Sequence, residues 1–251
     1  MGSLIYNTII ANKSVNKKML ALLVDPDKFF DSLIKNRILS VDSNHIDFIF
    51  VGGSLVNSSV ENCIVELKAH FNCPIVLFPG NPSQVTNMAD CMLYLSLISG
   101  RNSEFLIGQH VISAVSVKNI GIETIPTGYI LIDGGNITSV QYISNTMPIP
   151  NGKSDICTST AIAGELLGLK MIYLEAGSGA SKIVSPEMIK SVAENIQIPI
   201  IVGGGIRDKQ NAQSIYTAGA DIIVIGTAAE ENNSVIKQIS SVRDYFNTSN
   251  N

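Results

Sequence analysis

The chain has few charged residues, no basic cluster and no long hydrophobic run. Charged residues make up 15% of its 251 residues, and the formal net charge is −4. No basic stretch is interleaved with aromatic residues, which argues against a nucleic-acid surface. The apolar runs are too short to span a bilayer, and residues 1–10 lack the charged and apolar regions of a signal peptide. We therefore expect a cytoplasmic protein with no transmembrane segment and no nucleic-acid partner.

Residues that bind transition metals or form disulfides are scarce. No pair of cysteines has Cys-x-x-Cys spacing, and the histidines are scattered without metal-ligand spacing. The cysteines lie in or beside apolar segments, so we expect reduced thiols of the core. The residues concerned are Cys63, Cys73, Cys91, Cys157, His45, His70 and His110.

Short, continuously apolar segments recur along the whole chain. Parallel strands covered on both faces have this pattern, and the clearest helical patterns between them cover residues 186–196 and 208–218. The length is usual for one (β/α)₈ barrel. We therefore predict one α/β domain over residues 1–251, a TIM barrel, with a frayed tail over residues 247–251. The predicted strands are Met19–Val24, Ile46–Val51, Ile75–Phe78, Cys91–Leu97, Gly128–Ile132, Met171–Leu174, Pro199–Val202 and Asp221–Ile225.

The crossover between the third and fourth predicted strands is unusually short. About a dozen residues separate Phe78 from Cys91, and they include two prolines and a glycine, which is barely enough for a helical connection. Length alone favours a compact irregular loop. A missing third helix would also leave an apolar gap in the outer ring, and a barrel that holds a long hydrocarbon would use such a gap.

Three of the last strands run into turns of small residues. These turns are Ala176–Gly179, Gly203–Gly205 and Gly226–Thr227. Glycine lets backbone N–H groups approach a ligand closely, and a helix that opens there adds a favourable field for an anion. Three such turns in succession indicate a phosphate-binding site after the last strands of the barrel.

Oxygen-bearing side chains follow the first two strands. Asp25 and Asp27 are the hard ligands that Mg²⁺ prefers, and Ser54 carries a hydroxyl at the end of the second strand. By themselves these residues fit ordinary turns and a helix N-cap equally well or better.

Glu175 stands between the sixth strand and its glycine turn. An acid beside an anion is unfavourable unless it binds a substrate hydroxyl or takes its proton. Tyr173, two residues earlier, is expected to point to the same side of the strand. A capping role is the alternative for Glu175.

These segments together resemble the geranylgeranylglyceryl phosphate synthase family. The similarity covers nearly the whole chain, and its most specific string is Tyr-Leu-Glu-Ala-Gly-Ser-Gly from Tyr173. Leu23 stands where the bacterial heptaprenyl branch carries a lysine, which favours the branch of many archaea and some bacteria. The segments that carry the resemblance are Val24–Lys28, Gly52–Ser54, Phe78–Pro82, Ser96–Asn102, Tyr173–Ala180 and Val202–Arg207.

The resemblance implies a TIM barrel with an irregular or missing third helix. It implies an Mg²⁺-dependent prenyltransferase that joins a polyprenyl diphosphate, expected to be geranylgeranyl, to the C3 hydroxyl of sn-glycerol 1-phosphate. The product is the first ether of archaeal-type lipids. Barrels of this kind usually assemble, so we also expect a homo-oligomer, either dimer or hexamer, with transient membrane contact when the product is released.

The resemblance also assigns site residues. Asp25 and Ser54 match the Mg²⁺ positions, and Glu175 is the catalytic residue that deprotonates the attacking hydroxyl. Arg101 and Arg207 receive no role. The expected sn-glycerol 1-phosphate site comprises Tyr173, Glu175, Ala176, Gly177, Ser178, Gly179, Gly204, Gly205, Gly226 and Thr227.

Two other functions use some of the same features. A phosphosugar isomerase, lyase or flavin-dependent barrel would explain the glycine turns, but neither Asp25 with a metal nor the apolar gap. A yellow purified protein would indicate the flavin. A non-catalytic barrel is less consistent with the presence of Asp25, Ser54 and Glu175 together. Prenyl transfer is therefore the function that we expect.

Overall fold

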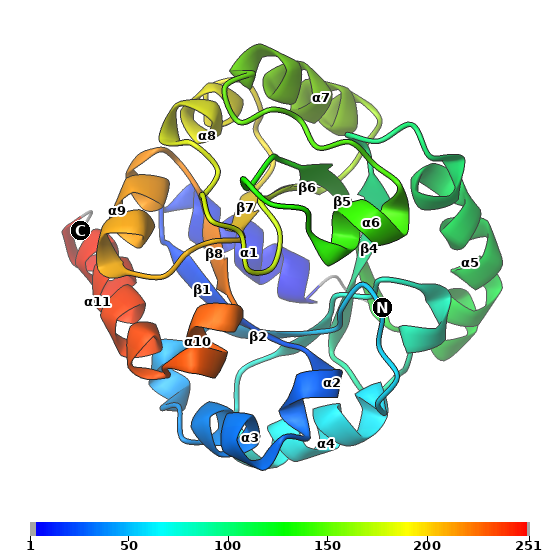
Figure 1. Ribbon diagram of the computed structural model, residues 1–251, viewed down its shortest axis with the longest axis vertical. Coiled ribbons are helices and arrows are strands. Elements are labelled where there is room, and N and C mark those ends of the chain that lie inside the picture. Colours follow the sequence, from blue (N-terminus) through cyan, green and yellow to red (C-terminus); the bar gives the residue numbers. More distant parts are fainter. Residues whose placement is uncertain (1–3, 250–251) are drawn as a thin grey trace.

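A closed barrel of eight parallel strands forms the centre of the computed structural model, which describes residues 4–249 (Figure 1). The strands follow one another around the barrel in chain order, and β8 pairs with β1 to close it. This confirms the predicted barrel. The strands are β1 (Met19–Val24), β2 (Phe48–Val51), β3 (Ile75–Leu77), β4 (Cys91–Leu97), β5 (Glu123–Leu131), β6 (Met171–Glu175), β7 (Ile200–Gly203) and β8 (Ile222–Ile225).

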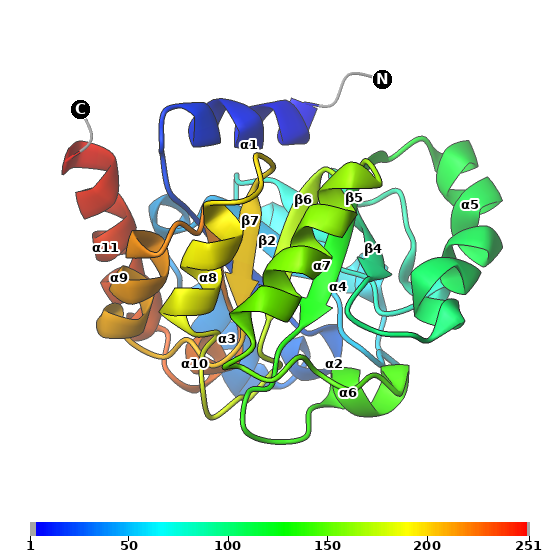
Figure 2. The same cartoon turned by 90° about the horizontal axis from the view of Figure 1, so that it is seen from above.

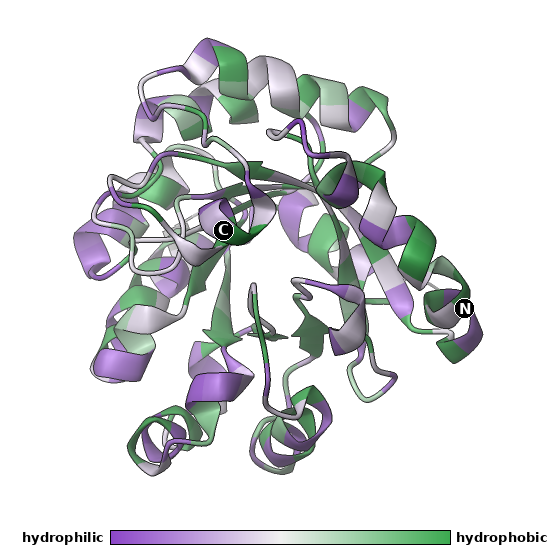
Figure 3. Cartoon of the chain, turned by 45° about the vertical axis from the view of Figure 1, so that its right-hand side comes forward, coloured by the Kyte–Doolittle hydropathy of each residue, from purple (hydrophilic) through white to green (hydrophobic). Residues whose placement is uncertain are grey.

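Helices surround the barrel and cover its outer face. Hydrophobic residues run along the strands, and the surrounding helices carry both hydrophobic and hydrophilic residues (Figure 3). The longer helices are α1 (Leu4–Ser14), α3 (Ser32–Leu39), α4 (Val60–His70), α5 (Gln109–Ile120), α7 (Ser154–Leu166), α8 (Pro186–Ala193), α9 (Lys209–Thr217) and α11 (Ser234–Ser249). Shorter helical segments are α2 (Pro26–Phe29), η1 (Ser43–His45), η2 (Pro82–Gln84), η3 (Glu104–Gly108), α6 (Ser139–Ser144) and α10 (Thr227–Glu231).

Local capping explains where the predicted helices begin. Ser185 accepts a hydrogen bond from the amide of Met188 and precedes a proline at the first position of α8. Asp208 caps α9 by accepting from the amide of Asn211 at 2.7 Å. Both predicted helices are present, but each ends before the last residue that its pattern suggested.

The strands differ from the prediction mainly in where they begin. β5 starts at Glu123, five residues before the predicted Gly128, because seven of its residues pair with β4. β2 starts at Phe48, since Ile46 ends the 3-10 turn η1. The expected frayed tail is also wrong in part, because α11 continues to Ser249 and Asn247 accepts a hydrogen bond from the amide of Lys18. Residues 250–251 lie outside the described part.

The third crossover carries no α-helix. Between β3 and β4 the chain makes only the 3-10 turn η2, which confirms the predicted irregular connection. The side chain of Gln84, 2% exposed, fastens this loop. Its amide nitrogen donates to the carbonyl of Gly53 at 2.8 Å, and its oxygen accepts from the amide of Gly80.

Helix α1 lies across the end of the barrel opposite the loops that follow the strands (Figure 2). Its Ile5 and Ile9 belong to the same apolar cluster as the residues inside the barrel. The carboxylate of Glu123 accepts hydrogen bonds from the amides of Ile5 and Tyr6, at the first turn of α1. Helix α1 therefore covers this end of the barrel, whereas the carboxyl ends of the strands bear a polar cavity.

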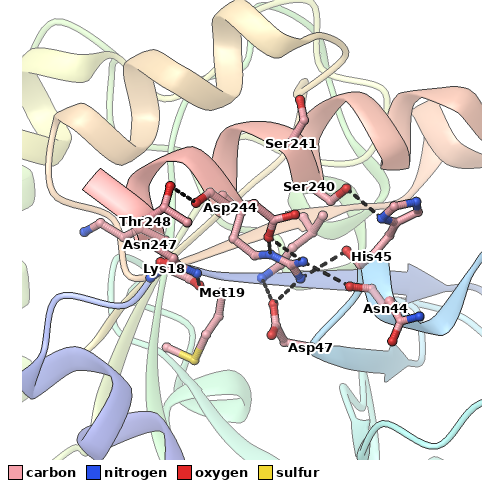
Figure 4. Close-up of polar contacts among 12 residues, drawn as sticks. Lys18, Met19, Asn44, His45, Asp47, Ser240, Ser241, Asp244, Asn247 and Thr248 are labelled. Carbon is pink, nitrogen blue, oxygen red and sulfur yellow. Dashed lines mark hydrogen bonds and ion pairs between the residues drawn. The ribbon is translucent and has the colours of Figure 1, made fainter. Parts of the chain in front are cut away.

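A buried arginine, Arg243, joins α11 to the segment before β2, and Figure 4 labels its partners Asn44, His45, Asp47 and Asp244. The guanidinium of Arg243 is 2.8 Å from a carboxylate oxygen of Asp47, and it also donates to the carbonyls of Asn44 and His45. The same oxygen of Asp47 accepts from the amide of Leu20 in β1. This network therefore connects the last helix of the chain to its first two strands.

Among residues 4–249, the cysteines are free and no helix is long and apolar enough to cross a membrane. Cys63, Cys91 and Cys157 are buried, as expected, whereas Cys73 is half-buried. Burial raises the pKa of Cys63 to about 12 and that of Cys73 to about 11. Neutral thiols are poor nucleophiles, which agrees with a packing role.

Candidate active site

A polar cavity of about 230 Å³ opens at the carboxyl ends of the strands. It collects residues from the loops after β1, β2, β6, β7 and β8. Ten of the twelve residues predicted from the sequence line it, whereas Ala176 and Gly177 lie behind its wall. The ten are Asp25, Ser54, Tyr173, Glu175, Ser178, Gly179, Gly204, Gly205, Gly226 and Thr227.

Glu175 is the last residue of β6 and is 6% exposed. Its Oε1 accepts a hydrogen bond of 2.6 Å from the amide of Gly177. Burial raises the pKa of Glu175 to about 7, while the Gly177 amide acts against the rise. A carboxylate with such a pKa exchanges protons near neutrality, as a general base needs to.

Tyr173 faces Glu175 across the same point of the barrel, as the sequence predicted. A Cβ on Gly203 would lie 2.6 Å from both the Tyr173 hydroxyl oxygen and Oε2 of Glu175. The hydroxyl is buried and completes no hydrogen bond of good geometry within residues 4–249, although it lies close enough to the Glu175 carboxylate to act against the rise of the Glu175 pKa. A buried hydroxyl without a well-formed hydrogen bond, beside a carboxylate, can hydrogen-bond a ligand that reaches this point.

Aromatic rings surround this position. The ring of Tyr173 lies 5.4 Å from that of Phe78 and 5.2 Å from that of Tyr129, measured between centroids. Phe78 and Tyr129 are 5.9 Å apart. The Glu175 carboxylate therefore has the polar glycine turns on one side and these aromatic rings on the other.

The glycine turns leave unpaired amides at the wall of the cavity. No acceptor within residues 4–249 takes a hydrogen bond from the amides of Ser178, Gly179, Gly204 or Gly205. Three of these residues have positive φ, which directs the amides in a way that glycine allows at little cost. Such amides form an anion-binding concavity.

The turns differ in how they continue. Only the third opens a helix at once, since α10 begins at Thr227, whereas loops separate the first two turns from α8 and α9. The hydroxyls of Ser178 and Thr227 are 3.1 Å apart and connect the first turn to the third. The amides of Ala176 and Gly177 donate to Gly203 and Glu175, so these two residues support the turn from behind.

The two acids after β1 have different surroundings. Asp25 is half-buried and lines the cavity, and its Oδ1 caps α2 by accepting from the amide of Asp27 at 3.0 Å. Asp27 is exposed, and its carboxylate accepts from the amides of Asn57 and Ser58 in the next loop. The structure thus supports both the capping role of Asp25 and a free oxygen for a ligand, while Asp27 fastens a loop.

The residues fit a magnesium site that is completed by substrate. Among the described residues no group of three histidine, cysteine, aspartate or glutamate side chains could hold a metal. Mg²⁺, however, commonly takes one or two carboxylates together with phosphate oxygens and water. No described residue donates to Oδ2 of Asp25, and Ser54 lines the same cavity.

An apolar groove of about 110 Å³ continues from the polar cavity. Both hollows are lined by Gly53, Ser54, Phe78, Tyr129 and Val140, so they meet at these residues. The groove runs between the helix-free crossover and α5, where the third helix is missing. Its remaining lining includes Pro79, Pro82, Val85, Leu93, Tyr94, Leu95, Leu97, Phe105, His110 and Ile143.

Three charged residues of the cavity received no role in the sequence analysis. Lys28, Arg207 and Glu230 line it together with Asp25 and Glu175. Lys28 and Arg207 stand within the segments that carry the resemblance, so their positions were a signal. Glu230 lies three residues beyond the third turn, and only the short helix α10 brings it to the cavity.

Comparison with known proteins is consistent with this geometry. A model of the PcrB family matches residues 12–243. The chain is 51% identical over 241 residues to the geranylgeranylglyceryl phosphate synthase of Chitinophaga pinensis, with 96% of each chain covered. It is 38% identical over 228 residues to the protein of that name from Methanosphaera stadtmanae, covering 90% of this chain and 93% of the relative.

A solved structure shows the same arrangement. The (S)-3-O-geranylgeranylglyceryl phosphate synthase of Thermoplasma acidophilum, in complex with its substrate sn-glycerol-1-phosphate, aligns with a TM-score of 0.84 and 28% identity. The alignment covers 96% of this chain and 98% of that chain.

Proposed function

The chain belongs to the PcrB family and is a prenyltransferase of the geranylgeranylglyceryl phosphate synthase type, and we propose that it joins a polyprenyl diphosphate to the C3 hydroxyl of sn-glycerol 1-phosphate. The donor is geranylgeranyl diphosphate, the reaction uses Mg²⁺, and the product is the first ether of archaeal-type lipids. The observation that carries the proposal is the continuity of the cavity around Glu175 with the apolar groove.

The polar cavity suits the acceptor substrate. The free amides of the turns at Gly179 and Gly205 would hold its phosphate, and the Tyr173 hydroxyl would meet a glycerol hydroxyl. The Thermoplasma acidophilum relative binds sn-glycerol-1-phosphate in a barrel of the same architecture. Fixing the phosphate in this way orients the reacting hydroxyl and lowers the entropic part of the barrier.

The groove suits the donor. A hydrocarbon chain in it would replace water along Leu93, Leu95 and Phe105, and burial is worth ~0.8 kcal/mol per CH₂-sized group. The diphosphate would then remain at the junction with the polar cavity, near Ser54 and Asp25. Mg²⁺ bound there would stabilise charge on the diphosphate.

In this proposal Glu175 acts as the base. In the reaction the C1–O bond of the donor breaks and its electron pair stays on the diphosphate. The C3 oxygen of the glycerol bonds to C1 and its proton passes to the Glu175 carboxylate. Because the carboxylate is buried and held by the Gly177 amide, it needs little reorganisation to accept that proton.

Self-association into a dimer or hexamer belongs to the same proposal. Helix α5 exposes Val111, Ile112 and Val115 to between 66% and 72%, and apolar side chains in a row favour contact with another subunit. Light scattering of the purified chain measures its mass directly, and a monomer at micromolar concentration would contradict self-association.

A product assay by mass spectrometry tests the reaction. The chain is given Mg²⁺ with either sn-glycerol 1-phosphate or its 3-phosphate enantiomer, against geranyl, farnesyl, geranylgeranyl and longer diphosphates. We expect an ether only from the 1-phosphate, formed fastest with geranylgeranyl diphosphate, and none in the presence of a chelator. The absence of product from every pair would refute prenyl transfer, and the isomerase or lyase function would then be tested.

A further inference from the structure

A lysine and a buried glutamate form an ion pair at the rim of the polar cavity. The Nζ of Lys28 in α2 is 2.8 Å from Oε2 of Glu230 in α10, and both side chains line the cavity. The Glu230 side chain is 9% exposed, whereas that of Lys28 is 40% exposed. The ammonium of Lys28 therefore donates to one fixed acceptor, and it is exposed toward the cavity, where it can donate to a ligand.

Helix α10 holds Glu230 in place. The backbone carbonyl of Glu230 accepts a 2.8 Å hydrogen bond from the guanidinium of Arg37 in α3, and α10 packs against α3. Figure 1 shows α10 near α3, and α3 also packs against α2, which carries Lys28. A glutamate fixed in this way holds the flexible side chain of Lys28 in one direction. A surface lysine without such a partner is not held in this way.

The charges of the cavity require a cation at this point. Three carboxylates, those of Asp25, Glu175 and Glu230, line a cavity that has to accept two phosphate-bearing substrates. Lys28 and Arg207 are the positive side chains among the described residues that line it. Each of the two reduces the repulsion that these carboxylates exert on an anionic substrate at short range.

The two cations serve different ends of the cavity. Arg207 follows the turn at Gly205, where the acceptor phosphate is expected. Lys28 lies in α2, whose N-cap is Asp25; the amide of Lys28 donates to the Asp25 carbonyl at 3.1 Å, and both side chains line the cavity. Lys28 is therefore close to the carboxylate beside which the donor diphosphate is expected.

We propose that Lys28 binds the diphosphate of the prenyl donor and stabilises the charge that it gains on departure, and that Glu230 is a positioning residue for Lys28. This inference rests on the proposed prenyl transfer. When the C1–O bond of the donor breaks, the electron pair remains on the diphosphate oxygen. The ammonium of Lys28 donates a charge-assisted hydrogen bond to the diphosphate, and such bonds are about twice as strong as neutral ones.

Binding of inorganic pyrophosphate, measured by calorimetry with and without Mg²⁺, tests the inference apart from turnover. We expect Lys28→Met to weaken pyrophosphate binding about ten- to hundredfold and Lys28→Arg to restore most of it. The KM for the prenyl donor rises and kcat falls, while the KM for sn-glycerol 1-phosphate stays within about twofold. The matched control is Lys35→Met, which removes an ion pair with Glu66 outside the cavity and leaves all these values unchanged.

A second variant keeps the test independent of folding. Lys28→Met leaves the buried Glu230 carboxylate unpaired, which destabilises the fold. The double variant Lys28→Met/Glu230→Gln removes that charge as well, and it too has to bind pyrophosphate more weakly than the wild type. Wild-type affinity for pyrophosphate in the folded double variant would overturn the inference. Failure of the proposed prenyl transfer would be recognised separately, because the wild type would then bind pyrophosphate but form no ether.

Discussion

Glu175 and Asp27 illustrate how the surroundings of single residues decide what two acids near one cavity can do. Burial raises the pKa of Glu175 to about 7, and the Gly177 amide and the Tyr173 hydroxyl offset only part of that rise. Asp27 is exposed and accepts several hydrogen bonds, so its pKa is lowered. The sequence placed both acids at the ends of strands. Only their burial and partners separate a proton acceptor from a residue that fastens a loop.

The raised pKa of Glu175 predicts a specific pH dependence. The folded chain binds this proton more tightly than the unfolded chain, so the free energy of unfolding falls as the pH rises from 4.5 to about 7, by about 3 kcal/mol in all. Glu175→Gln lacks this loss and should become more stable than the wild type above pH 7 but not at pH 4.5. Denaturant unfolding at both pH values measures the difference.

Ionisation of Glu175 should change activity in the direction opposite to its effect on stability. The base is active when deprotonated, so kcat/KM for sn-glycerol 1-phosphate should rise through about pH 7, and Glu175→Gln should lose nearly all turnover at every pH. Equal pH dependence of stability in both proteins, together with an active Gln variant, would remove Glu175 from the mechanism.

At the scale of elements, the turn after β7 has to approach the turn after β6 closely. A Cβ on Gly204 would lie 2.6 Å from both Oε1 of Glu175 and the amide nitrogen of Gly177. The sequence predicted that these glycines admit a ligand. The structure adds that Gly204 also admits the carboxylate of Glu175 and its hydrogen bond.

Gly204→Ala should therefore displace Glu175 and abolish turnover. The matched control is Gly168→Ala, since Gly168 has φ +89° against +87° for Gly204, but no atom lies within 4 Å of its added Cβ. Both variants carry the same backbone strain, about 1–2 kcal/mol. We expect only Gly204→Ala to lose sn-glycerol 1-phosphate binding in calorimetry, and equal binding by the two variants would contradict the close approach.

For the whole molecule, Arg243 and Asp47 connect α11 to the first two strands. Arg243 is 6% exposed and donates to groups of three residues that precede β2, in addition to Asp244. This network lies at the end of the barrel opposite the open one. In TIM barrels, residues at that end serve stability rather than chemistry. It ties together chain segments almost 200 residues apart.

Arg243→Met should lower the free energy of unfolding by about 2–3 kcal/mol, somewhat less than the ~3–5 kcal/mol of a fully buried pair because the Asp47 side chain is 27% exposed. The KM values of both substrates should not change. Lys190→Met is the control, since its ion pair with Glu194 is exposed and contributes at most about 0.5 kcal/mol. An unfolding free energy equal to that of the control would show that the network does not stabilise the barrel.

The sequence by itself determined the barrel, the short third crossover and ten of the residues that line the cavity. Continuous apolar strands, small-residue turns and the string from Tyr173 are local patterns, and local chemistry is enough to recognise them. Strand ends such as Glu123 were not determined in this way, because pairing with β4 extends β5 through polar residues.

Only the tertiary structure decided how these pieces act on one another. It turned Asp27 away from the cavity, placed Ala176 and Gly177 behind its wall, and brought Glu230 to Lys28 across 202 positions of sequence. It also joined the groove to the polar cavity at Phe78 and Tyr129. Burial, distance and partner choice depend on residues far apart in the chain, and no local pattern encodes them.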